Sequence, residues 1–257
     1  MKKYVVLLLL LLPGVCNAAN IGLREVSDTL QKPFRPDVVR ARGTDKSGIF
    51  DFQGDFFQQS KIAAIDRTQR GRGLVSFRFD YPSSDRVPLA MFRWEYQEPS
   101  RQEVVSNGET MWVYLPENRQ VIVSDISQVT QQRSDNPMTF LTGLGNLSRD
   151  FSIRWAVPDH DLEGNPVLEL KPHRVSGLIR SLQIAVDRDA VRDYAENNQV
   201  GNIFPILATT VIDPSGNETT IEFSDIRFNQ GLSSGFFEFV QPAGVEVVRP
   251  TGNEMGF

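Results

Sequence analysis

The sequence predicts a mainly β protein whose strands form one long antiparallel sheet. Apolar and polar residues alternate with a period of two along most of the chain, which is typical of strands with one buried face. Short clusters of Gly, Pro, Asn and Asp, such as Asn107-Gly108, separate the alternating runs. Counting the runs gives about eleven strands, and links this short join antiparallel neighbours.

The alternating runs follow one another along the chain. The clearest of them cover residues 50–56, 75–81, 92–96, 182–186, 221–228 and 237–239. In each run one face is apolar and the other is polar or charged. A sheet of this length with one apolar face must curl on itself or be covered by other elements.

Few segments favour a helix. Residues 22–30 are one candidate, and residues 136–151 are a better one because apolar side chains recur there at helical spacing. Gly143 and Gly145 lie inside the second candidate and cost about 1 kcal/mol each relative to Ala, so this helix is predicted to be marginal. Residues 187–200 are polar and fit either a short helix or an extended loop.

Residues 1–18 have the features of a secretory signal peptide. Two lysines precede an apolar run at 4–12, and small residues allow cleavage after Ala18. No later stretch approaches about 18 consecutive apolar residues, so the sequence predicts no transmembrane helix. We therefore expect a soluble, secreted chain in which residues 19–257 form a single domain.

Cys16 leaves one alternative open at this end of the chain. It would carry a lipid anchor if the segment were a lipoprotein signal, but Pro13-Gly14-Val15 is a poor match to the residues that precede such a cysteine. A cleaved chain would instead lose its single thiol and need no disulfide. The formal net charge of −5 argues against nucleic acid as the main partner.

Two short motifs suggest chemistry but lack the context that the chemistry requires. Ser233 lies in a G-x-S-x-G pattern, yet a strand-like run follows it, and both histidines, His160 and His173, lie upstream. Asp159-His160-Asp161 has no second cluster of metal ligands, and no nucleotide-binding pattern occurs. We therefore expect no metal, no cofactor and no enzymatic activity. A hydrolase using Ser233 or a carboxylate pair is the least favoured alternative.

The stretch from Phe92 to Pro116 concentrates aromatic residues and has no Cys or His. Alternation places Phe92, Trp94 and Tyr96 on one face of a strand. By pattern alone such rings either fill an ordinary core, which is the commoner case, or line a site for an apolar ligand.

Several motifs of this stretch and of the C-terminal region follow a characteristic order. They are Phe92-Arg93-Trp94, Pro99, Val105-Ser106-Asn107-Gly108, Trp112-Val113-Tyr114 with Pro116, Phe237-Glu238-Phe239, and Pro242-Ala243-Gly244-Val245. In this order and spacing the chain resembles the periplasmic lipoprotein carriers, the LolA family. The resemblance covers roughly residues 45–250.

The resemblance implies an unclosed antiparallel β-barrel of about eleven strands, with short α-helices as a lid over an apolar cavity. It implies that the cavity binds the acyl chains of lipoproteins and carries them across the periplasm from the inner to the outer membrane. The implied partners are acylated lipoproteins, an inner-membrane ABC transporter as donor and an outer-membrane acceptor lipoprotein. Nothing in the sequence suggests an oligomer, so we expect a monomer.

The resemblance also implies three groups of site residues. The candidates for the cavity wall are Phe52, Phe77, Phe79, Phe92, Trp94, Tyr96, Trp112 and Tyr114. The candidates for the lid are Met138, Phe140, Leu141, Leu144 and Leu147. The family holds its lid with an arginine that a proline follows, and the nearest candidates in this chain are Arg86 and, more weakly, Arg78. Two alternatives stay open beside this reading: a carrier of another lipid, such as a glycolipid or hopanoid, and a membrane-anchored acceptor that retains Cys16.

Overall fold

The computed structural model describes residues 21–40, 48–80, 89–126, 140–199 and 201–249. The predicted signal peptide therefore lies outside the described residues, as does Cys16. None of the helices within these ranges is both long and apolar enough to cross a membrane.

Within the described residues, twelve strands form one open sheet in the order β12-β6-β5-β4-β3-β2-β1-β11-β10-β9-β8-β7. All neighbours are antiparallel except β12 and β6, which run parallel. The strands are β1 (Asp51–Ile62), β2 (Arg67–Asp80), β3 (Leu89–Glu98), β4 (Gln102–Ser106), β5 (Thr110–Leu115), β6 (Gln120–Asp125), β7 (Phe151–His160), β8 (Pro166–Pro172), β9 (Ser181–Val186), β10 (Ile206–Ile212), β11 (Glu218–Phe228) and β12 (Glu246–Val248). The predicted class, a mainly β and unclosed sheet, is confirmed, with twelve strands in place of about eleven.

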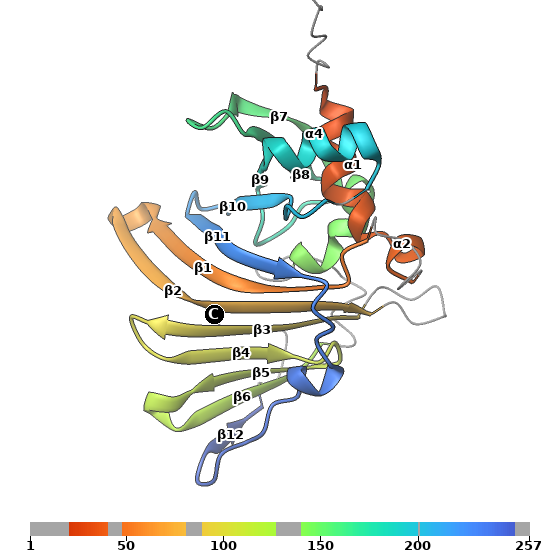
Figure 1. Ribbon diagram of the computed structural model, residues 1–257. Helices are drawn as coiled ribbons and strands as arrows, with labels where there is room; N and C mark the ends of the chain where they lie inside the picture. The colour runs from red at the N-terminus through yellow and green to blue at the C-terminus, as the bar shows by residue number, and fades with distance from the viewer. Residues whose placement is uncertain (1–20, 41–47, 81–88, 127–139, 200, 250–257) are drawn as a thin grey trace, which may run out of the picture.

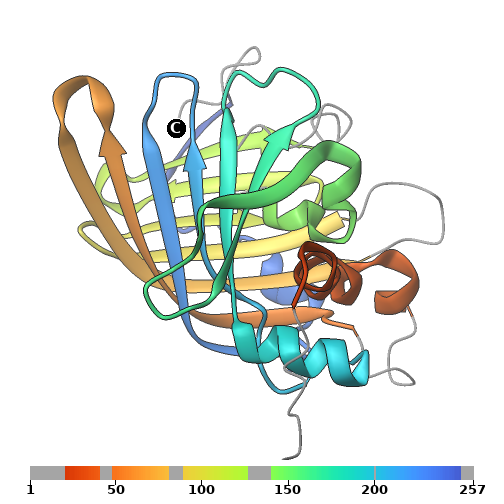
Figure 2. The same ribbon diagram turned by 90° about the horizontal axis from the view of Figure 1, so that it is seen from above.

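The sheet curls strongly, and helical segments gather on its concave side toward one end (Figures 1 and 2). These segments are α1 (Leu23–Gln31), η1 (Lys32–Phe34), α2 (Pro36–Arg40), η5 (Phe140–Asn146), α3 (Leu147–Asp150) and α4 (Arg188–Asn197). Other single turns in the described part of the chain are η2 (Ala63–Ile65), η3 (Pro116–Asn118) and η6 (Ser234–Phe237). The apolar face of the sheet is thus buried in two ways, by the curl of the sheet and by a layer of helical segments.

Local chemistry explains where two of the helices begin. The carboxylate of Glu25 accepts a hydrogen bond from the backbone N–H of Gly22, which pairs one of the free donors at the start of α1. The side chain of Asp187 accepts from the backbone N–H groups of Asp189 and Ala190, so the polar stretch that fitted either helix or loop becomes α4.

Over the described residues 140–151, the helix predicted for 136–151 is wrong in type and ends early, and residues 136–139 lie outside the described part of the chain. Residues 140–146 form the 3₁₀-helix η5, α3 adds one turn, and Phe151 already begins β7. Gly145 explains part of the difference, because a Cβ atom there would lie 2.2 Å from the carbonyl oxygen of Phe34. The segment is therefore shaped by close packing on η1 rather than by helix propensity.

The predicted strand over 237–239 is also wrong. Phe237 ends the single turn η6 and its ring is fully buried. The chain leading into this turn crosses the outer, convex face of the sheet, where the carboxylate of Asp51 accepts three backbone N–H groups, from Gln230, Gly231 and Leu232. This connection carries the chain from β11 to β12, which lies at the far edge of the sheet (Figure 1).

Candidate functional site

Five of the predicted cavity residues lie together on the concave face of β1, β2 and β3. The ladder sets Phe52 opposite Phe77 and Phe77 opposite Phe92, so their rings share one face. Phe52 and Phe77 stack with centroids 5.0 Å apart, and Trp94 meets Phe77 edge-on at 5.9 Å. With Phe79 included, these side chains are at most 1% exposed. We call these five residues the aromatic wall.

The aromatic wall contains one polar atom without a partner. The indole nitrogen Nε1 of Trp94 is buried and finds no hydrogen-bond acceptor among the described residues. Leaving such a donor unpaired in an apolar environment costs about 1–3 kcal/mol. The wall therefore holds a donor that an acceptor on a bound molecule would satisfy.

Helical segments cover the aromatic wall from the concave side. Leu141, Leu144 and Leu147 are each at most 1% exposed and belong to the same apolar cluster as the wall. From the other side of the cover, Phe34 of η1 meets Phe79 edge-on at a centroid distance of 5.2 Å. We call residues 140–150 together with 23–34 the helical cover.

A polar contact fastens the two parts of the helical cover to each other. The side-chain oxygen of Gln31, the last residue of α1, accepts hydrogen bonds from Ser148 N at 2.9 Å and from Ser148 Oγ at 2.8 Å. No pattern in the sequence indicates this pair, because the two residues are far apart in the chain and neither belongs to a motif. Arg86 and Met138 lie outside the described residues, and Phe140 is the first residue of η5.

Tyr96 follows Trp94 on the same face of β3 and marks the end of the aromatic wall. Its ring meets Phe56 edge-on at 4.9 Å, and its hydroxyl donates a hydrogen bond of 2.7 Å to Oε1 of Gln58. Burial raises the pKa of Tyr96 to about 12, so the hydroxyl stays neutral at physiological pH. One side of this residue is thus apolar and the other is hydrogen-bonded.

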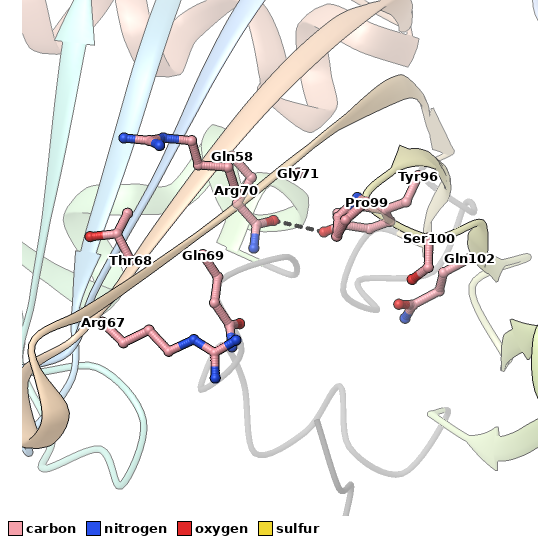
Figure 3. Close-up of a pocket in the computed structure, with 10 residues that line it drawn as sticks. All are labelled: Gln58, Arg67, Thr68, Gln69, Arg70, Gly71, Tyr96, Pro99, Ser100 and Gln102. Atoms are coloured by element: carbon pink, nitrogen blue, oxygen red, sulfur yellow. Dashed lines mark hydrogen bonds between the residues drawn. The ribbon is translucent and has the colours of Figure 1, made fainter.

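A polar pocket of about 470 Å³ opens immediately beyond Tyr96. It lies between the long β1–β2 hairpin and the turn that joins β3 to β4 (Figure 3). The lining residues are Gln58, Arg67, Thr68, Gln69, Arg70, Gly71, Tyr96, Pro99, Ser100 and Gln102. The concave face therefore changes from aromatic to polar within one strand length.

Two of the candidate cavity residues, Trp112 and Tyr114, lie on the opposite face of the sheet. In β5, Met111 and Val113 are buried on the concave side, so alternation turns Trp112 and Tyr114 outward. There both rings lie against Phe239, with centroid distances of 6.3 and 5.5 Å. This placement corrects the expectation that they join the cavity wall.

Arg78 also lies on the outer side, where its Nη1 atom donates to the carbonyl oxygen of Leu232. It therefore holds the C-terminal connection and contacts no part of the helical cover through that bond. Arg93 acts in the same region, with hydrogen bonds of 3.2 Å to the carbonyl oxygens of Phe236 and Glu238. Alternation along β2 already predicts the outward direction of Arg78, because Phe77 and Phe79 face the concave side and Arg78 lies between them.

The residues of the two short motifs have local partners in the structure. Ser233 precedes the single turn η6 instead of a catalytic helix. His160 lies 3.0 Å from Asp159 and stacks on Trp155, and a hydrogen bond from His160 lowers the pKa of Asp159. The described residues contain no group of three or more potential metal ligands.

The family model of the outer membrane lipoprotein carrier protein LolA matches residues 47–240. The outer-membrane lipoprotein carrier protein of Bordetella avium is 26% identical over 254 residues, which cover 97% of this chain and all of that protein. The carrier of Pseudomonas paraeruginosa is 29% identical over 162 residues, which cover 62% of this chain and 66% of that protein.

A LolA superfamily protein from Nitrosomonas europaea, solved by crystallography, shares 15% sequence identity, with 84% of this chain and 96% of that chain covered. Its TM-score of 0.36 is too low to add to the comparison. The family model, by contrast, spans both the aromatic wall and residues 140–150 of the helical cover. On that match, this chain belongs to the LolA family of outer membrane lipoprotein carrier proteins.

Proposed function

We propose that this protein is a periplasmic carrier that binds the acyl chains of lipoproteins on its concave face and moves them from the inner to the outer membrane. Membership of the family supports the kind of cargo, as do relatives named outer-membrane lipoprotein carrier protein. The observation that carries the proposal is the aromatic wall, which short helical segments cover and, in the described part of the chain, no second sheet covers.

The size of the cargo explains why a concave apolar face is needed. Each buried methylene contributes about 0.8 kcal/mol, so the acyl chains of one lipoprotein represent tens of kcal/mol of apolar surface that cannot cross water uncovered. Aromatic rings are large and stiff, and rings on adjacent strands hold such a face in shape. The wall is thus suited to contact acyl methylenes along its whole length.

The helical cover is the element that has to move. Leu141, Leu144 and Leu147 occupy the volume over the wall, and acyl chains would take their place when residues 140–150 swing away. Residues 140–146 are a short 3₁₀ segment, whose hydrogen-bond geometry is poorer than that of an α-helix, and this suits a two-state element with a small free-energy gap. When the cover is open, Nε1 of Trp94 becomes a donor for an ester carbonyl at the head of an acyl chain.

Loading has to be driven from outside the chain, because its sequence holds no nucleotide-binding pattern. We propose an inner-membrane ABC transporter as the donor and an outer-membrane acceptor lipoprotein as the receiver, with no cofactor on the carrier. Empty carrier returns with its cover closed, since a large exposed apolar face invites aggregation.

Site-specific photocrosslinking tests the proposal. A benzophenone side chain replaces Leu144 in the helical cover, and a matched variant carries it in place of Trp112, on the outer face. With a synthetic triacylated lipopeptide, we expect acyl adducts at position 144 and none at position 112. Equal labelling at both positions, or none at either, would contradict acyl binding on the concave face.

A further inference from the structure

We propose that the polar pocket beyond Tyr96 binds the extended peptide that follows the acylated cysteine of the cargo, by adding it as a strand along the free edge of β2. The inference rests on the proposed function and extends it from the lipid to the polypeptide. Its occupant is a short segment of peptide backbone, recognised by hydrogen bonds and not by a particular side chain.

The free edge follows from the ladder. Strand β2 pairs with β1 from Arg67, opposite Ile62, to Arg78, opposite Asp51. Its pairing with β3 begins only at Arg72, opposite Glu98. Among the described residues, 67–71 therefore have a ladder neighbour on one side only. Every second backbone N–H and C=O group along such an edge is open to an added strand.

The side chains beside this edge suit a peptide backbone. Gln69 from β2 and Gln102 from β4 lie on either side of the pocket (Figure 3), and neither side-chain amide has a hydrogen-bond partner among the described residues. Each amide offers both donors and an acceptor, which matches the alternating N–H and C=O groups of an extended chain. Ser100 adds a hydroxyl at the same rim. The pocket's volume of about 470 Å³ lies within the usual range for ligand sites and leaves room for a few residues.

The position of the pocket selects the part of the cargo that reaches it. Tyr96 contacts Phe56 at the end of the aromatic wall and Gln58 at the start of the pocket. An acyl chain laid along the wall with its head toward Tyr96 therefore places the cysteine and the first peptide residues beside the β2 edge. The change from aromatic to polar side chains matches the change from lipid to peptide within one molecule.

Two ligands separate the peptide contribution from the lipid contribution. One is triacylated cysteine amide, and the other is the same lipid with a four-residue tail of Ser and Asn, left uncharged so that Arg67 and Arg70 do not bias the result. We expect the tail to increase the affinity about 3- to 10-fold, as for one or two net hydrogen bonds. The double variant Gln69→Ala, Gln102→Ala should lose most of this gain and keep its affinity for the tailless lipid.

Gln241→Ala is the control, because Gln241 is an exposed glutamine outside the pocket lining, and its side chain donates a hydrogen bond to the carbonyl oxygen of Val245. It should leave both affinities unchanged. Hydrogen exchange provides a second readout, since the tailed ligand should slow amide exchange in residues 67–71 and the tailless ligand should not.

The possible outcomes separate a failure of the peptide site from a failure of the proposed acyl-chain binding. Equal affinities for the two ligands, with no added protection at 67–71, overturn the peptide site and leave acyl binding in place. Failure of the wild-type protein to bind either ligand overturns the proposed function, and the peptide site with it.

Discussion

The two ends of the concave face differ in what covers them, and their side chains differ accordingly. At one end the aromatic wall lies beneath the helical cover, and its rings are excluded from water. At the other end residues 67–70 are exposed, and the lining of the pocket is polar. A single sheet thus carries two surfaces, because an apolar end without a cover would be a site of aggregation.

Strand β2 passes through both surfaces and shows how the change is made. Its exposed half carries charged and amide side chains, and its buried half carries Val75, Phe77 and Phe79. Between them, Gly73 lets β3 approach closely, since a Cβ atom there would lie 1.9 Å from the carbonyl oxygen of Glu95. The β2–β3 ladder is irregular between Arg72 and Gly73, at the point where the free edge begins. The two ends of the concave face therefore differ in backbone pairing as well as in side chains.

The largest expected contrast between the two ends is in stability. Phe77→Ala should lower the free energy of unfolding by about 3–5 kcal/mol, because it removes a fully buried ring that touches four other aromatic side chains. Gln69→Ala, on the same strand, should change it by no more than about 0.5 kcal/mol. Urea denaturation followed by circular dichroism measures both. Similar losses of unfolding free energy in the two variants would contradict the difference in burial between the two ends.

The second contrast is a pH dependence at the boundary between the ends. Burial raises the pKa of Tyr96 to about 12, against about 10 in an unfolded chain. The folded state therefore favours the neutral hydroxyl of Tyr96. The resulting contribution to the free energy of unfolding is complete below pH 10 and is lost between about pH 10 and 12. The loss amounts to about 2–3 kcal/mol at 1.36 kcal/mol per unit of pKa.

Tyr96→Phe isolates this effect, because the other groups that titrate in alkali are common to both proteins. At neutral pH the variant should be less stable by about 1 kcal/mol, since it lacks the hydrogen bond to Gln58. Toward pH 12 the order should reverse, with the variant the more stable protein. Parallel stability curves from pH 7 to 12 would show that Tyr96 is solvated and that the boundary is not dry.

Much of the fold was predictable because it depends on local pattern. Alternation identified the strand that carries Phe92, Trp94 and Tyr96 and the turn at Asn107-Gly108, and both are present. The same alternation could have excluded Trp112 and Tyr114 from the concave face. The register across this turn sets Trp112 opposite Val105 and Tyr114 opposite Glu103, on the outer face of the sheet.

The rest depended on contacts between distant segments. The helical cover is held by Gln31 and Ser148, and its shape depends on Gly145 meeting Phe34, so neither feature has a signature in the local sequence. The alternation at residues 237–239 predicts a strand. Hydrogen bonds from Gly231 to Asp51 and from Arg93 to the carbonyl oxygen of Phe236 instead hold this connection on the outer face. The polar pocket arises from the different lengths of neighbouring strands, which only the registers show.

The smallest expected contrast is within the helical cover itself. Gly145→Ala would place a Cβ atom 2.2 Å from the carbonyl oxygen of Phe34, whereas an Ala at Gly143 would meet nothing within 4 Å. Gly145→Ala should therefore lower the free energy of unfolding by about 1–3 kcal/mol, as for overpacking, and Gly143→Ala should change it by no more than about 0.5 kcal/mol.

The same pair of variants links the cover to the wall beneath it. If residues 140–150 are pushed off η1, the aromatic wall becomes accessible, so Gly145→Ala should bind more of an apolar fluorescent dye and exchange its amides faster in this segment. Gly143→Ala should match the wild type in both measurements. If the two variants behave alike, the cover does not rest on η1 in solution, and the covered end of the concave face is as open as the polar end.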